Sequence, residues 1–257
     1  MVFQFEKNSV LLEQPLLLDI KQRRFLVGIR FAVQSIGLSK ARLWTSLELW
    51  RNQEQSATED VTVAELFTDV WSIVDNARRL HRLLWKIPHL NEIGFVKSFV
   101  EKWEIILKSV RGAIQHFDGE VSQENMPDNY VFGQLHWIDS ISRGASGEVY
   151  VYFVPAGPQA NNLLRPTGFP MSIPVDSGDS IYPVILETGG ESLNISDLLT
   201  DIEKTIKLLE SELREIVDHE MLNALFVQPE QKDKIGLIAK VDRGFEIVFS
   251  NFRIVNE

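Results

Sequence analysis

Apolar residues recur every three or four positions through most of the first 120 residues of the chain. The first pattern covers residues 16–51 and includes Leu18, Phe25, Ile29, Val33, Ile36, Leu43, Trp44, Leu47 and Trp50. This spacing places the apolar side chains on one face of a helix. Because Gly37, Leu38 and Ser39 interrupt the pattern, we predict a kink there or a break into two helices.

Two further helices are predicted before residue 121. Residues 62–87 carry the most regular pattern, which Pro88 ends, with Thr58 or Asp60 expected as the N-cap. Its apolar positions are Val63, Leu66, Phe67, Val70, Ile73, Val74, Ala77, Leu80, Leu84 and Ile87. Residues 92–120 repeat it through Val96, Phe99, Trp103, Ile106, Val110, Ala113 and Phe117. Three such stripes can be buried together only by packing into a helical bundle.

The pattern changes near Pro127. The segments YVFGQLHWID (130–139) and EVYVYFVPA (148–156) are rich in aromatic and β-branched residues, which is typical of strands. The intervening SISRGASG suits a hairpin connection. A further strand is predicted at 181–187 and a fourth long helix at about 196–226. The end of the chain, KIGLIAKVDRGFEIVFSNFRIV, is predicted to form two strands joined at residues 242–244.

This order of elements predicts an α+β fold. We expect a long-helix bundle, made of three N-terminal helices plus one later helix, with a small antiparallel β-sheet. Residues 1–121 form the helical bundle, and residues 122–257 hold the β segment, the fourth helix and the C-terminal β-hairpin. Two arrangements stay open. The fourth helix completes the bundle within one domain, or residues 122–257 form a separate α+β domain.

Composition narrows the cellular context. The chain has 257 residues and no cysteine, which excludes disulfides, thiolate metal sites and cysteine nucleophiles and fits a reducing compartment. Its N-terminus has no basic region ahead of an apolar core, so we expect no secretory signal. Its apolar runs are far shorter than the roughly 18 residues that span a bilayer. We therefore expect a cytoplasmic protein that does not enter a membrane.

Charge is distributed unevenly along the chain. Residues 1–121 hold 16 Lys and Arg against 15 Asp and Glu, whereas residues 122–257 hold 10 against 21. Any nucleic acid should therefore bind the first half. The candidate nucleic-acid-binding residues are Arg78, Arg79, Arg82 and Lys86, which with His81 are predicted on the outer face of the second helix. The alternative is a solvated face paired with acidic residues of the second half.

A second candidate site lies in SVRGAIQHFDGEV (109–121). At about 100° per residue, Arg111 and His116 flank the apolar seam on opposite sides, roughly 140° apart. The spacing Arg111-x4-His116 near the end of a bundle helix resembles the Arg-x(4–6)-His motif of the HEPN superfamily. That resemblance implies an all-α domain, a dimer and metal-independent RNA cleavage. It also implies that His116 is a general acid or base and that Arg111 holds the scissile phosphate.

The motif differs from the family pattern at Gly112. Active members usually carry a polar residue directly after the arginine, and glycine can neither bond the imidazole nor favour the helix. The β-rich segment 130–187 is also outside the family's minimal bundle. The purely structural alternative has His116 bonded to Asp118 or Glu120, and Arg111 lying over the bundle with its guanidinium in water.

Three functions follow from these readings. The first, which we favour because of Gly112, is a non-catalytic HEPN-like interaction module of a bacterial defence or toxin–antitoxin system. We expect a homodimer with a protein partner, and RNA as a further ligand. The second is a metal-independent endoribonuclease that uses Arg111 and His116. The third is a small-molecule binder that uses the long loop at residues 155–170. His136 shares a strand face with Gln134 and Ile138 but has no metal-ligand spacing, so we expect no metal and no cofactor.

Overall fold

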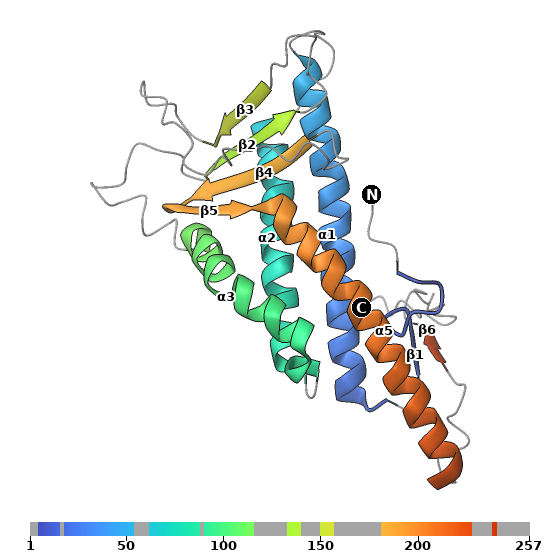
Figure 1. Ribbon diagram of the computed structural model, residues 1–257. Coiled ribbons are helices and arrows are strands. Elements are labelled where there is room, and N and C mark those ends of the chain that lie inside the picture. The colour runs from blue at the N-terminus through green and yellow to red at the C-terminus, as the bar shows by residue number, and fades with distance from the viewer. Residues whose placement is uncertain are drawn as a thin grey trace, which may run out of the picture.

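A computed structural model describes residues 5–15, 18–53, 62–87, 90–115, 133–139, 150–156, 181–227 and 238–240. It has long helices and a small antiparallel sheet, which confirms the predicted α+β class (Figure 1). The helices are α1 (Ile20–Gln53), α2 (Val63–Lys86), α3 (Gly94–Gln115) and α5 (Ile195–Val227), with a 3-10 turn η1 (Leu90–Glu92). Among these described helices, none combines the length and apolar character needed to cross a bilayer.

Helix α1 runs without interruption for 34 residues, so the predicted kink or break at residues 37–39 is wrong. Ser39 lies within the contact between α1 and α2, where its Oγ donates a hydrogen bond to Ser72 Oγ at 2.8 Å. Gly37 is buried as well. A single glycine costs a helix about 1 kcal/mol, and packing along the whole of α2 outweighs that cost.

Helix α2 begins one residue after Thr62, so the expected N-cap at Thr58 or Asp60 is also wrong. Glu65 N–H donates to Thr62 Oγ1 at 3.2 Å, and Thr62 N–H donates to Glu65 Oε2 at 2.7 Å. This reciprocal pair is a capping box, and it fixes where the chain enters the helix.

The sheet has the strand order β3-β2-β4-β5 and is antiparallel throughout. Its strands are β2 (Gln134–Asp139), β3 (Tyr150–Pro155), β4 (Ile181–Thr188) and β5 (Glu191–Asn194). The predicted pairing of the first two strands is confirmed, and β5 is an additional strand that the sequence pattern did not indicate. A separate pair joins β1 (Glu13–Pro15) to β6 (Ile238–Lys240). The second strand of the predicted C-terminal hairpin lies outside the described residues.

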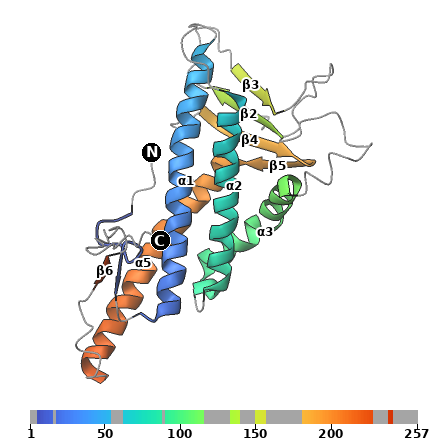
Figure 2. The same ribbon diagram turned by 180° about the vertical axis from the view of Figure 1, so that it is seen from behind.

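Buried side chains from both halves of the sequence form one continuous core. It includes Ile29 and Leu47 of α1, Leu80 of α2, Trp137 of β2 and Leu209 of α5, among others. Helix α5 follows β5 directly and packs against β4 and α3. Figure 2 shows that α5 and the sheet lie on one side of the α1–α2 pair, so the opposite side of this pair is an outer surface.

Candidate interaction surface

Arg111 of α3 is tied to α2 by an ion pair. Its Nε donates a hydrogen bond to Asp75 Oδ1 at 2.7 Å, and 26% of the Arg111 side chain is exposed. Asp75 lies one helical turn before Arg79, so Arg111 is held one turn of α2 from one of the candidate nucleic-acid-binding residues. His116 lies outside the described residues, as do Asp118 and Glu120. The geometry of the Arg111–His116 pair is therefore not described.

Gly112 is in an open part of the helix surface. A Cβ built at Gly112 would meet no atom within 4 Å, so close packing does not require glycine here. We predict that Gly112→Ala raises the free energy of unfolding by about 0.5–1 kcal/mol, because alanine loses less backbone entropy in a helix. Urea denaturation would measure the change. A variant less stable than the parent would contradict the helical environment of this residue.

The predicted placement of all five basic residues on the outer face of α2 is wrong for two of them. His81 is fully buried, and only 13% of the Arg78 side chain is exposed. Arg78 donates two hydrogen bonds to Glu104 of α3, at 3.3 Å each, and a third to His81 Nδ1 at 3.1 Å. Because arginine can only donate, His81 Nδ1 is the acceptor and Nε2 carries the proton.

The Nε2 proton of His81 takes part in the same contact between α2 and α3. Nε2 donates to the backbone oxygen of Val100 at 2.9 Å and lies 3.0 Å from Glu104 Oε2. Burial lowers the pKa of His81, against the opposing effects of Val100 and Glu104. The hydrogen bond from Arg78 is the main cause that lowers the pKa of Glu104. Arg78 and His81 are therefore structural residues of the α2–α3 contact.

The lowered pKa of His81 predicts a loss of stability in acid. An unfolded histidine protonates near pH 6.5, whereas buried His81 resists protonation, so stability falls as the pH drops below about 6.5. The loss is at most about 1.4 kcal/mol per pH unit for this residue. Urea denaturation of the parent and His81→Gln at pH 7.5, 6.5 and 5.5 should show a smaller decline for the variant. An identical decline in both proteins would contradict this role.

The comparison with His81→Gln separates His81 from other titrating groups. Burial also lowers the pKa of His136 and raises that of Glu210, and both groups are present in the parent and in the variant. Glu210 affects the pH dependence of stability in the opposite direction to the histidines. Because the pKa of its carboxyl group is raised in the folded protein, the folded state loses stability as the pH rises above the pKa of the unfolded carboxyl group. Only the difference between the two proteins therefore reports on His81.

The other three basic residues predicted on the outer face of α2 are exposed. Arg79, Arg82 and Lys86 are open to solvent, and in the described part of the chain none forms an ion pair. The alternative prediction paired this face of α2 with acidic residues of the second half. Arg78 instead pairs with Glu104, which belongs to the first half.

An apolar stripe on α1, which sequence reasoning missed, lies on the same outer surface. Phe31 is 60% exposed, Leu38 is 57% exposed and Leu49 is 37% exposed. Their spacing of 7 and 11 residues places them on one line along a helix. Gly28, on another face of α1, lies against Leu83 of α2. The sequence shows the three residues at helical spacing, but it does not show that this side of α1 faces solvent.

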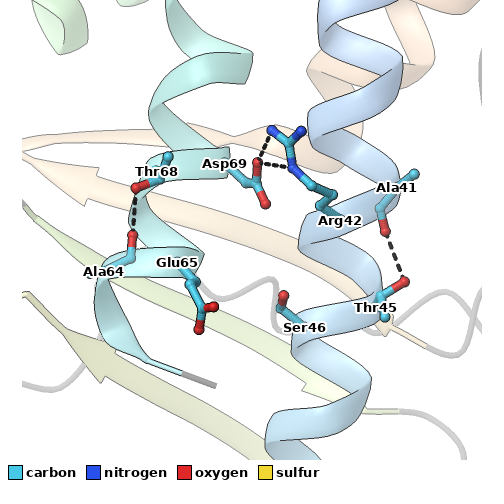
Figure 3. A pocket seen from close by; sticks show the side chains of 8 residues that line it. All are labelled: Ala41, Arg42, Thr45, Ser46, Ala64, Glu65, Thr68 and Asp69. Carbon is cyan, nitrogen blue, oxygen red and sulfur yellow. Dashed lines mark hydrogen bonds and ion pairs between the residues drawn. The ribbon is translucent and has the colours of Figure 1, made fainter. Parts of the chain in front are cut away.

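A shallow groove of about 570 Å³ runs between α1 and α2 at the end nearer the sheet (Figure 3). It is lined mainly by short side chains: Ala41, Arg42, Thr45, Ser46, Ala64, Glu65, Thr68 and Asp69. Arg42 of α1 and Asp69 of α2 are joined across the groove, because Arg42 Nε donates a hydrogen bond to Asp69 Oδ1 at 2.9 Å. Leu38 and Leu49 lie before and after the groove along α1, so the groove continues the apolar stripe.

The predicted relation of His136 to its strand is confirmed. His136 is fully buried on β2, with Gln134 and Ile138 on the same face. Its Nε2 lies 3.6 Å from Glu187 Oε1 on β4, and burial lowers the pKa of His136. No group of three or more potential metal ligands occurs in the described ranges. The loop at 155–170 lies almost wholly outside the described residues, which end at 156 here.

In searches against known protein families, curated proteins and solved structures, this chain shows no significant match.

Proposed function

We propose that this chain is a non-catalytic, HEPN-like interaction module of a bacterial defence or toxin–antitoxin system. It acts in the cytoplasm as a homodimer that also binds a protein partner. The observation that carries this proposal is the exposed stripe of Phe31, Leu38 and Leu49, which runs along a well-packed helix pair. These residues share one side of α1 with the groove between α1 and α2, and together they offer an apolar surface on which another protein could dock.

The environment of Arg111 agrees with a structural role. A guanidinium that donates to Asp75 at 2.7 Å is already held by a carboxylate, which would compete with a phosphate for it. The same contact holds Arg111 at Asp75, one helical turn of α2 from exposed Arg79, and this arrangement favours the second candidate, a metal-independent endoribonuclease. In that case, Arg79 and Arg82 would hold the RNA backbone while Arg111 and His116 act on the scissile phosphate.

Cleavage of total RNA by the purified chain in EDTA separates these two functions. The interaction module leaves the RNA intact, and the Arg111→Ala and His116→Ala variants behave as the parent does. Cleavage by the parent that disappears in both folded variants would overturn the proposal in favour of the ribonuclease. Circular dichroism and thermal unfolding of each variant would show that any loss is not a loss of fold.

A further inference from the structure

Five exposed positive charges without an ion-pair partner in the described part of the chain lie toward one end of the α1–α2 pair. Lys21 and Arg24 of α1 and Arg79, Arg82 and Lys86 of α2 are all exposed, and none forms an ion pair within the described ranges. We refer to these five residues as the basic patch. Elsewhere on the helices, exposed Lys108 of α3 and Lys204 of α5 also form no ion pair within the described ranges, but each lies on a different helix. The helix cations that do form ion pairs are Arg42, Arg78, Lys97, Lys102, Arg111, Lys207 and Arg214.

The helix register places the basic patch around Phe31. Gly28 lies against Leu83, and Ser39 bonds Ser72, so α1 and α2 are antiparallel and in fixed register. At 1.5 Å per residue, the five cations then fall within about 16 Å along the helix axis. This concentration of unpaired positive charge occurs in a chain whose formal net charge is −10. Like charges repel one another, so a bound anionic group would relieve a cost that the free protein carries.

The apolar stripe extends well beyond the basic patch. Phe31 and Leu49 are 18 residues apart, which corresponds to about 27 Å of helix. The far end of the stripe meets the groove between α1 and α2, where short side chains leave room for the ridge of another helix. The surface therefore combines positive charge with Phe31 at one end. At the other end it combines Leu38 and Leu49 with the groove.

We propose that this surface binds an acidic amphipathic helix of a partner protein. The apolar face of that helix packs on Phe31, Leu38 and Leu49 and enters the groove, and its carboxylates lie over the basic patch. This inference rests on the proposed interaction function and names the class of partner. A nucleic acid would satisfy the basic patch, but its phosphates would gain nothing from Leu38, Leu49 and the groove.

A display library of 20-residue helical peptides provides the test. Leucine occupies the seam positions, and Lys, Glu, Gln or Ser is drawn at random at all others. The full chain is used for selection, and affinities of the recovered peptides are measured by fluorescence anisotropy. We expect the selected peptides to be enriched in Glu at one end. We also expect the double variant Arg79→Glu/Arg82→Glu and the variant Phe31→Ser each to weaken binding by at least about tenfold.

Two control variants match these changes elsewhere on the surface. Ile105→Ser replaces an apolar residue that is 76% exposed on α3, and Lys204→Glu reverses an exposed charge on α5. Both should bind the selected peptides as the parent does. All substituted side chains are exposed, so unfolding should be unaffected, and thermal denaturation would verify this.

Several outcomes would overturn the inference: no peptide above background, no enrichment in Glu, or affinities that the basic-patch variants leave unchanged. Binding of a single-stranded 20-nucleotide DNA that Arg79→Glu/Arg82→Glu abolishes, with no selected peptide, would assign the surface to nucleic acid instead. Failure of the peptide selection with intact RNA in EDTA would remove only this inference. RNA cleavage would remove the proposed function itself.

Discussion

Replacing Trp137 with alanine should lower the free energy of unfolding by about 3–5 kcal/mol, the largest effect we expect from a single substitution. Trp137 is fully buried on the central strand β2, and its ring stacks on Tyr152 with centroids 5.1 Å apart. Its removal leaves a cavity between the sheet and the helices. Chemical denaturation monitored by far-UV circular dichroism would measure the loss.

Trp85→Ala is the matched control for this substitution. Trp85 lies on α2 and is 55% exposed, so its truncation should change stability by no more than about 0.5 kcal/mol. Similar losses for the two variants would contradict the placement of β2 in the core. A small loss for Trp137→Ala alone would mean that the sheet contributes little to the stability of the helices.

Gly133→Ala should be the next most damaging substitution, with a loss of about 2–4 kcal/mol. Gly133 has a φ of 97°, which costs a residue with a side chain about 1–2 kcal/mol. A Cβ there would also lie 2.6 Å from the backbone oxygen of Glu187, so β2 and β4 would have to move apart. Displacements of this kind lower the free energy of unfolding by about 1–3 kcal/mol more, as overpacking does at other sites.

Gly190→Ala separates the two contributions to that loss. Gly190 has a φ of 80°, but a Cβ built there meets nothing within 4 Å. We therefore expect only the backbone cost of about 1–2 kcal/mol. Denaturant unfolding of both variants should give a clearly larger loss for Gly133→Ala. Equal losses would show that the close approach of Glu187 is relieved without cost.

The helices and their buried faces were predictable because α2 and α3 each repeat apolar residues at regular helical spacing. The same pattern alone could not locate the ends of elements. The capping box that starts α2 at Thr62 depends on mutual hydrogen bonds with Glu65, and the polar run before it offered several similar candidates. Gly37 suggested a break in α1 because its local helix propensity is low, whereas tertiary packing against α2 decides the outcome.

The candidate site was only partly predictable for a related reason. Arg79, Arg82 and Lys86 follow from helical spacing, but Arg78 and His81 are turned inward by Glu104 and by the carbonyl oxygen of Val100, partners 19 or more residues away. Phe31 was not among the predicted apolar positions of this helix, and Leu38 was assigned to the interruption at residues 37–39. Their exposure depends on which side of α1 contacts α2, which is a tertiary property that periodicity along α1 does not contain.

Cross-linking from the apolar stripe tests most directly whether this surface docks a partner. The photoreactive residue benzoylphenylalanine replaces Phe31 in one variant and Ile105 in another, in cells where the chain is native. We predict a dominant adduct from position 31 whose cross-linked peptide, identified by mass spectrometry, carries Asp and Glu beside apolar residues at helical spacing. Position 105 should give no such adduct. No adduct at position 31, or equal adducts at both positions, would contradict the account.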